Sequence, residues 1–167
     1  MTTPDLIDQL LTNLLACACE CLNTYSDCGC PCRNFVSAGA PPQDQCCDGG
    51  QLAIWSDRIY VHGNFPQEQG QVKVCTAPLA AEITMRLDRC FPSVKDNGEP
   101  PTADEIATAS ASIYKDMYTL TRCIICSLSS KGKFQESVFR GSRIIPPQGG
   151  CISVELRFTV QLIDPLP

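Results

Sequence analysis

Residues that support catalysis are scarce in this sequence. The only histidine is His62, so any Ser/His or Cys/His catalysis would have to pass through it. It follows an expected strand in a turn, and we interpret it as a solvated loop residue. No Gly-x-Ser-x-Gly, phosphate-loop or dinucleotide-binding pattern occurs, and the carboxylates are scattered over polar faces. We therefore expect no enzymatic activity and no cofactor.

Basic charge and long apolar runs are also lacking. The 13 Lys and Arg residues are outnumbered by 18 Asp and Glu, which gives a formal net charge of −5. A protein that clamps nucleic acid or an anionic membrane needs a basic footprint, so neither function is expected. Residues 1–5 include no basic region that would begin a signal peptide, and no apolar run approaches the length of a membrane span. We expect a soluble protein made in the cytosol.

The chain has the length of one globular domain. With 167 residues, of which 44% are hydrophobic, it can bury a core without cross-links. Apolar residues recur at three and four positions over 3–22 and 102–126, which predicts two helices. Alternating stretches predict strands within 51–90 and over 151–163. We expect an α+β fold in which both helices pack on a mostly antiparallel sheet of about four strands.

Three details of these elements can be predicted more closely. Residues Leu79–Cys90 alternate between apolar and polar side chains, which predicts a strand with one face in solvent. The alternation of the preceding strand breaks at Ser56 and Asp57, which predicts a β-bulge. Thr102 and Glu105 have the spacing of a capping box, which predicts the start of the long helix.

Cysteine is present in excess. Thirteen is an odd count, so at least one thiol must be free, ligate a metal or pair between chains. The pattern leaves disulfides, free buried thiols and a metal as open alternatives. The Cys-x-Cys spacing differs from the Cys-x-x-Cys pairs of zinc sites, so we predict no metal. If a metal is bound, the candidate ligands lie in the Cys-rich loop expected over 23–50 and are Cys28, Cys30, Cys32, Cys46 and Cys47.

Two cysteines of the first helix share its apolar face. Cys17 and Cys21 continue the stripe of Leu10 and Leu14, so we predict that both are buried. They are four residues apart on a helix, which holds their Cβ atoms ~6 Å apart and beyond disulfide reach. We therefore predict that they do not bond to each other, and that the loop cysteines form the bridges.

The segment 127–150 is a basic region in an acidic protein. It has four Lys and Arg residues against Glu136 alone and shows neither a helical nor a strand period. We interpret it as a loop or docking arm, because its apolar side chains would otherwise remain exposed. The candidate assembly residues are Lys131, Lys133, Phe134, Phe139, Arg140, Arg143 and Ile144.

Several short motifs in the chain carry a resemblance to a known family. They span residues 46–160 and comprise Cys46–Leu52, Asn64–Pro66, Arg89–Pro92, Asp96–Gly98, Pro100–Thr102, Asp116, Cys126 and Pro147–Cys151. In these motifs the chain resembles the Cys-rich neck proteins of long-tailed, siphovirus-type phages that infect actinobacteria. Its basic segment is longer than the pattern of that group.

The resemblance implies a structural role in the virion. It implies a tail terminator, which is an α+β subunit that forms a ring on the tail tube at the neck. The ring is expected to be a homohexamer. Its partners would be the tail tube protein and a head-completion or connector protein, with DNA only passing through the lumen. Assembly would take place in the host cytoplasm. The alternatives are a head-completion stopper and, from another class, a cytosolic cysteine-rich metal-binding module.

Overall fold

The protein has an α+β fold, as the sequence predicts, with six strands rather than about four in the described residues. A computed structural model describes residues 3–44, 46–71, 75–129 and 136–162. The elements are α1 (Thr3–Tyr25), β1 (Arg33–Val36), β2 (Gln51–Asn64), β3 (Gln67–Glu68), β4 (Leu79–Cys90), α2 (Ala103–Leu128), β5 (Ser137–Gln148) and β6 (Cys151–Leu162).

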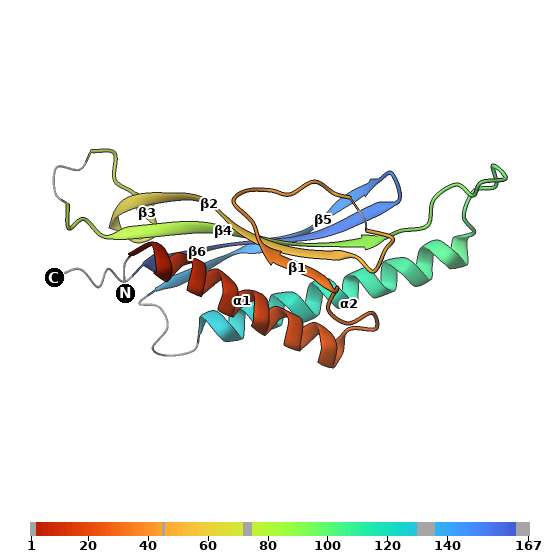
Figure 1. The fold of residues 1–167 in the computed structure, drawn as a ribbon, viewed down its shortest axis with the longest axis horizontal. Helices are drawn as coiled ribbons and strands as arrows, with labels where there is room; N and C mark the ends of the chain where they lie inside the picture. The colour runs from red at the N-terminus through yellow and green to blue at the C-terminus, as the bar shows by residue number, and fades with distance from the viewer. Residues whose placement is uncertain (1–2, 45, 72–74, 130–135, 163–167) are drawn as a thin grey trace.

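The strands form one mixed sheet with the order β1-β2-β4-β6-β5, and β3 pairs with β2 beside this path. β1 runs parallel to β2, and every other pair is antiparallel. Both helices lie on the same side of the sheet, whereas the loop between β1 and β2 crosses the opposite side (Figure 1). None of the helices in the described ranges is both long and apolar enough to span a membrane.

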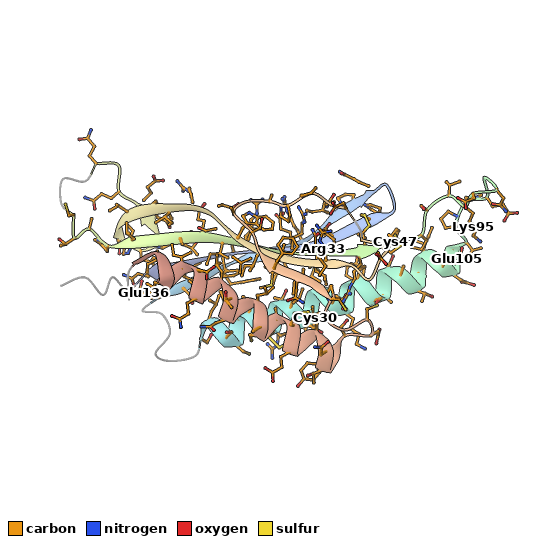
Figure 2. The ribbon with its side chains drawn as sticks, in the orientation of Figure 1. Cys30, Arg33, Cys47, Lys95, Glu105 and Glu136 are labelled. Atoms are coloured by element: carbon orange, nitrogen blue, oxygen red, sulfur yellow. A yellow bond between two sulfur atoms is a disulfide. The ribbon has the colours of Figure 1, made fainter. Side chains whose placement is uncertain are left out.

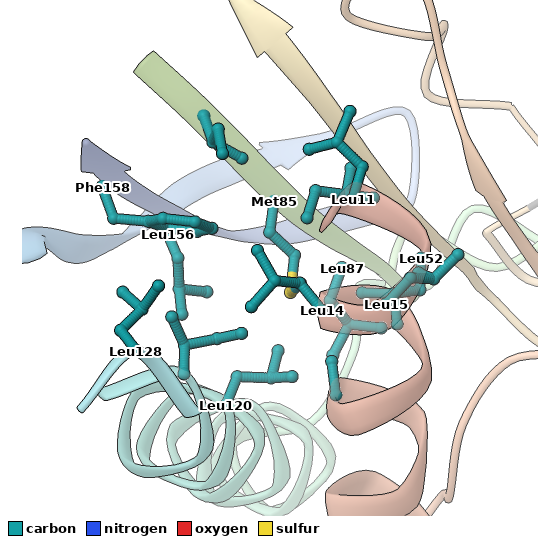
Figure 3. Packing of buried hydrophobic residues seen from close by; sticks show 14 of the residues in the cluster. Leu11, Leu14, Leu15, Leu52, Met85, Leu87, Leu120, Leu128, Leu156 and Phe158 are labelled. Carbon is teal, nitrogen blue, oxygen red and sulfur yellow. The ribbon is translucent and has the colours of Figure 1, made fainter. Parts of the chain in front are cut away.

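The main core lies between the sheet and the two helices. Alternate residues of β4 and β6, such as Met85 and Leu156, face α1 and α2 and are fully buried. Leu14 of α1 and Leu120 of α2 meet them from the other side, as Figure 3 shows. At about 25 cal/mol per Å² of apolar surface, this burial is the main source of stability of the fold.

The second face of β4 is buried, so the prediction that it lies in solvent is wrong. Thr84, Arg86 and Asp88 are at most 7% exposed. The cause is the loop after β1, which folds over this face: Arg86 Nη2 donates to Pro41 O at 2.6 Å, and Gln43 Nε2 donates to Ser153 Oγ at 2.6 Å.

Asp88 is the centre of the polar network beneath this loop. Its carboxylate accepts from Gln51 Nε2 at 3.0 Å and from Ser153 Oγ at 2.6 Å, and it pairs with Arg86 Nε at 3.0 Å. Buried charges are tolerated when they are paired and hydrogen-bonded. The sheet therefore has an apolar core on one face and a polar core on part of the other.

The bulge predicted at Ser56 and Asp57 is confirmed, because the register of β2 on β4 shifts between Ser56 and Arg58. The interpretation of His62 as a solvated loop residue is wrong. His62 lies within β2 and is 3% exposed, with its Nε2 3.2 Å from Gln161 Nε2 and its ring edge-on to Phe65. The strand continues past His62, and the chain returns through β3, so this residue is enclosed.

The basic segment is not a loop throughout, because β5 occupies residues 137–148. Two register shifts explain why its sequence lacks a strand period: they lie between Phe139 and Gly141 and between Ile145 and Gln148. Phe139 and Ile144 pack against the main core. The loop interpretation is therefore wrong for β5. Lys131, Lys133 and Phe134, predicted as assembly residues, lie outside the described residues. Residues 72–74 of the expected strand region lie outside them too.

The predicted capping box at the start of α2 is confirmed. Thr102 Oγ1 accepts from the Glu105 backbone N–H at 3.2 Å, and the Thr102 N–H donates to Glu105 Oε2 at 2.7 Å. Lys95 Nζ lies 3.3 Å from Glu105 Oε1, and Figure 2 shows both residues at the N-terminal end of α2. The Thr102 backbone N–H, then its hydroxyl and Lys95, hold the pKa of Glu105 below its ordinary value of 4.5.

We expect Thr102→Ala to lower the free energy of unfolding by about 1 kcal/mol, because it removes the acceptor for an otherwise unpaired helix N–H. Denaturant unfolding at pH 7 measures this loss, and Thr102→Ser, which keeps the hydroxyl, is the matched control. Because the pKa of Glu105 is lowered in the folded state, the contribution of its carboxylate to the free energy of unfolding is present above pH 4.5 and is lost as the pH falls. An equal loss in both variants would contradict the capping role.

Candidate assembly surface and cysteine clusters

β5 is the edge strand on one side of the sheet and its most exposed long strand. Each of its twelve residues is half-buried or exposed, whereas ten of the twelve residues of β6 beside it are buried. A long edge strand offers unpaired backbone groups to another chain. Pro146 and Pro147 lie at its C-terminal end, directly before Gln148, and interrupt this edge there because proline has no backbone N–H to donate. The part before Pro146 is the part that could take another strand.

The side chains of β5 divide between the two faces of the sheet. Phe139 and Ile144, predicted as docking residues, are used by the subunit's own core. Arg140 and Arg143 lie on the opposite face, where Arg140 Nε donates to Thr159 Oγ1 at 3.3 Å. Of the seven predicted assembly residues, these two arginines are the ones that the structure places on an accessible face.

A row of arginines and glutamates covers this face, and we call it the Arg/Glu face. Glu155 Oε1 accepts from Arg143 Nη2 at 2.8 Å and from Arg157 Nε at 2.9 Å. The Glu155 side chain is 8% exposed, whereas those of Arg143 and Arg157 are 61% and 57% exposed. One buried carboxylate is therefore shared by two guanidinium groups that still reach solvent.

The row continues onto β2 and β4 through Arg58 and Glu82. Arg58 Nε donates to Glu82 Oε2 at 3.0 Å, and Arg58 Nη1 donates to Glu68 Oε2 at 2.7 Å. The hydrogen bond from Arg58, aided by the charges of Arg140 and Arg157, lowers the pKa of Glu82, and both carboxylates raise the pKa of Arg58. Burial, then the charge of Glu82, raises the pKa of Tyr60 beside them. Arg58 and Glu82 are therefore charged at neutral pH, and they extend the ionic row of the Arg/Glu face.

Three of the resemblance motifs, Cys46–Leu52, Arg89–Pro92 and Pro147–Cys151, meet at one end of the sheet, which we call the motif end. Disulfides Cys46–Cys151 and Cys47–Cys90 join three of the segments there. The Phe91 N–H also donates to Gly150 O at 2.8 Å. Gly50 has φ of +82°, and a Cβ on it would lie 2.7 Å from Asp88 O, so only glycine fits this close approach. An open cavity of about 720 Å³ separates this end from the first half of α2.

The outer face of the helix pair is aromatic, and the sequence reading did not identify it. Tyr25, Tyr114 and Tyr118 are 59–66% exposed, and Ile125 is 37% exposed. An open groove of about 980 Å³ runs between α1 and α2 beside Tyr25 and Tyr118. The signal available in the sequence was the pair Tyr114 and Tyr118, four residues apart and opposite the apolar stripe of α2.

Eight of the thirteen cysteines form four disulfides in the described residues. The prediction that loop cysteines form bridges is confirmed for Cys30, Cys46 and Cys47, which cannot join Cys28 and Cys32 in a metal site while these disulfides are formed. Cys28 and Cys32 are exposed. The bonded pairs are Cys19–Cys30, Cys21–Cys123, Cys46–Cys151 and Cys47–Cys90.

The two cysteines on the face of α1 behave partly as predicted. Cys17 and Cys21 are not bonded to each other, but both are half-buried rather than buried. Cys21 instead bonds to Cys123 on α2. The reason is that this part of α1 faces α2 across the groove rather than the sheet.

No protein-family profile matches the chain, and no curated protein matches it. Its function is therefore argued from its motifs and its geometry. The features that bear on it are the open edge of β5, the Arg/Glu face, the motif end and the aromatic outer face of the helices.

Proposed function

We propose that the protein is a structural subunit of a phage neck, a tail terminator that forms a ring on the tail tube and joins it to the head. Its partners are copies of itself, the tail tube protein and a head-completion or connector protein. DNA passes through the lumen of the ring without being clamped. The observation that carries the proposal is the exposed edge of β5.

The edge of β5 fits a contact between neighbouring copies. A closed ring uses one surface of each subunit against a different surface of the next. Strand addition at a sheet edge supplies such a contact, since backbone hydrogen bonds give affinity and alternate side chains give specificity. Arg140 and Arg143 project from this strand, and Arg143 pairs with the buried carboxylate of Glu155 while its own side chain still reaches solvent. They would therefore fix the orientation of the neighbouring subunit through charge.

The motif end supports the same proposal. Three of the segments that carry the phage resemblance are separated by up to about a hundred residues, yet Cys46 and Cys151 are bonded to each other. Two disulfides and the network of Asp88 hold these loop segments together. Loops positioned on a rigid scaffold are where partner contacts are usually made. This end is therefore the proposed contact with the tail tube or the connector.

A head-completion stopper is the competing role within the neck. It would use the same kind of ring but sit on the portal side, so the partner and the symmetry distinguish the two. Averaged images of purified particles are expected to show a sixfold ring of this protein at the top of the tail. Twelvefold order, or a single copy, would overturn the tail-terminator proposal.

Charge reversal on β5 tests whether the edge of this strand makes an assembly contact. We expect Arg140→Glu with Arg143→Glu to reduce the yield of joined particles by about tenfold or more, because two attractive contacts become repulsive. The yield is measured by complementing a phage that lacks the protein. Arg122→Glu, an exposed arginine on α2, is the matched control. Equal yields from both variants, with both proteins folded, would show that the β5 edge makes no assembly contact.

A further inference from the structure

Three cysteine sulfurs converge in the groove between the two helices. Cys17 and Cys21 project from α1 one turn apart, and Cys123 reaches them from α2. The three Sγ atoms all lie within 4.8 Å of one another. Cys21 and Cys123 form a disulfide, and Cys17 Sγ lies 3.2 Å from Cys123 Sγ. A disulfide uses two sulfurs, so the third thiol in this cluster has no role in that bond.

The position of the three sulfurs is set by the helix packing as well as by the disulfide. Ala18 and Leu22 of α1 and Leu120 and Ile124 of α2 are fully buried and hold the helices together. Ala18 lies directly after Cys17, and its small side chain permits α1 and α2 to approach each other closely. This packing does not depend on the disulfide, so the three sulfurs are expected to stay together when the disulfide is reduced.

We propose that in the reduced protein Cys17, Cys21 and Cys123 bind one thiophilic dication, of which Zn²⁺ is the expected example. Zinc bound to thiolates has Zn–S distances of about 2.3 Å in tetrahedral geometry, which requires sulfurs about 3.8 Å apart. The three Sγ atoms lie within 4.8 Å of one another, and this range includes the separation that zinc requires. Binding releases the thiol protons, and the disulfide-bonded form cannot bind because two of the ligands are consumed.

The surroundings suit such a site. Cys123 is buried and the other two are half-buried, so the metal would be partly shielded from water. Lys115 and Arg122 line the same groove and offset part of the negative charge of three thiolates. The groove is open to solvent, so the fourth position can be filled by water.

Titration of the full chain with Co²⁺ and Zn²⁺ tests the proposal. The protein is reduced with a phosphine in metal-free buffer, and Co²⁺ is the spectroscopic probe for thiolate ligation. We expect Cys17→Ser to bind one equivalent fewer than the wild type, or to bind it about tenfold or more weakly. Cys17 belongs to none of the four disulfides, so the variant can be purified with all four formed before it is reduced. Circular dichroism confirms that the variant is folded.

Matched variants and a protection assay complete the test. Cys28→Ser and Cys32→Ser, which alter exposed loop thiols, are expected to bind as the wild type does. Zn²⁺ should slow alkylation of Cys17 in the reduced wild type, read by mass spectrometry, and should leave Cys28 unaffected. Unchanged stoichiometry and affinity in Cys17→Ser, or equal alkylation of Cys17 with and without Zn²⁺, would overturn the proposal. Assembly of the ring is not part of either readout, so failure here leaves the proposed function standing.

Discussion

Replacing Asp116 with alanine is expected to lower the free energy of unfolding by about 3–5 kcal/mol, because it leaves a buried guanidinium without its counter-ion. Asp116 is 1% exposed, and its Oδ2 accepts from Arg89 Nε at 3.0 Å. Ser26 donates to the other carboxylate oxygen, and Arg89 donates to the carbonyl of Gly29. The pair therefore ties the loop after α1 to both α2 and the end of β4.

Denaturant unfolding of the oxidised protein measures this effect, which corresponds to a fall in Tm of roughly 6–20 °C for a domain of this size. Asp27→Ala is the matched control, since the Asp27 and Lys115 side chains are 60% and 49% exposed and such pairs contribute about 1 kcal/mol at most. Arg89→Met with Asp116→Leu should cost less than Asp116→Ala alone, because no charge is left buried. A loss for Asp116→Ala no larger than for Asp27→Ala would contradict this account.

Leu120→Ala is expected to cost about 2–5 kcal/mol, since it opens a cavity where the long helix meets the sheet. Leu120 is fully buried, and Figure 3 shows it among Leu14, Leu128 and Leu156. Denaturant unfolding of the oxidised protein measures this loss as well. Because α2 contributes to both helix-helix and helix-sheet packing, the surrounding side chains cannot collapse far to fill the space.

Tyr118→Ala is the control for this second change, two residues earlier on the same helix. Its side chain is 66% exposed, so we expect a change within about 0.5 kcal/mol in the isolated subunit. A cost near that of Leu120→Ala would mean that the aromatic outer face is part of the monomer's core. A small cost would leave Tyr118 available for contacts with other proteins.

The sequence was most informative where local chemistry decides the structure. Leu79–Cys90 is a strand with the boundaries expected from its alternation. The helix expected over 102–126 spans Ala103–Leu128, and its start follows from the reciprocal hydrogen bonds of Thr102 and Glu105. The helix expected over 3–22 continues to Tyr25, and the strand expected over 151–163 is Cys151–Leu162. Periodicity and capping therefore located the long elements.

Prediction failed where distant parts of the chain decide the outcome. The burial of Arg86 and Asp88 depends on a loop that returns over the sheet, and no local pattern announces this contact. β5 was missed because two register shifts break its alternation. Helical spacing excluded a Cys17–Cys21 bond but could not identify Cys123, 102 residues after Cys21, as the partner. The candidate site depends on each of these long-range contacts.

The connectivity of the disulfides also determines how the subunit would respond to a pulling force. Tension between the two ends passes from Cys19 to Cys30, then from Cys46 to Cys151, and bypasses the chain between them. Only about 50 residues lie on this shortest covalent path, so even an unfolded subunit could extend to roughly 170–190 Å, against roughly 550–600 Å for the open chain. Most of the sheet and the whole of α2 would carry no end-to-end load. These two bonds thus limit the extension of an unfolded subunit to about a third of that of the open chain.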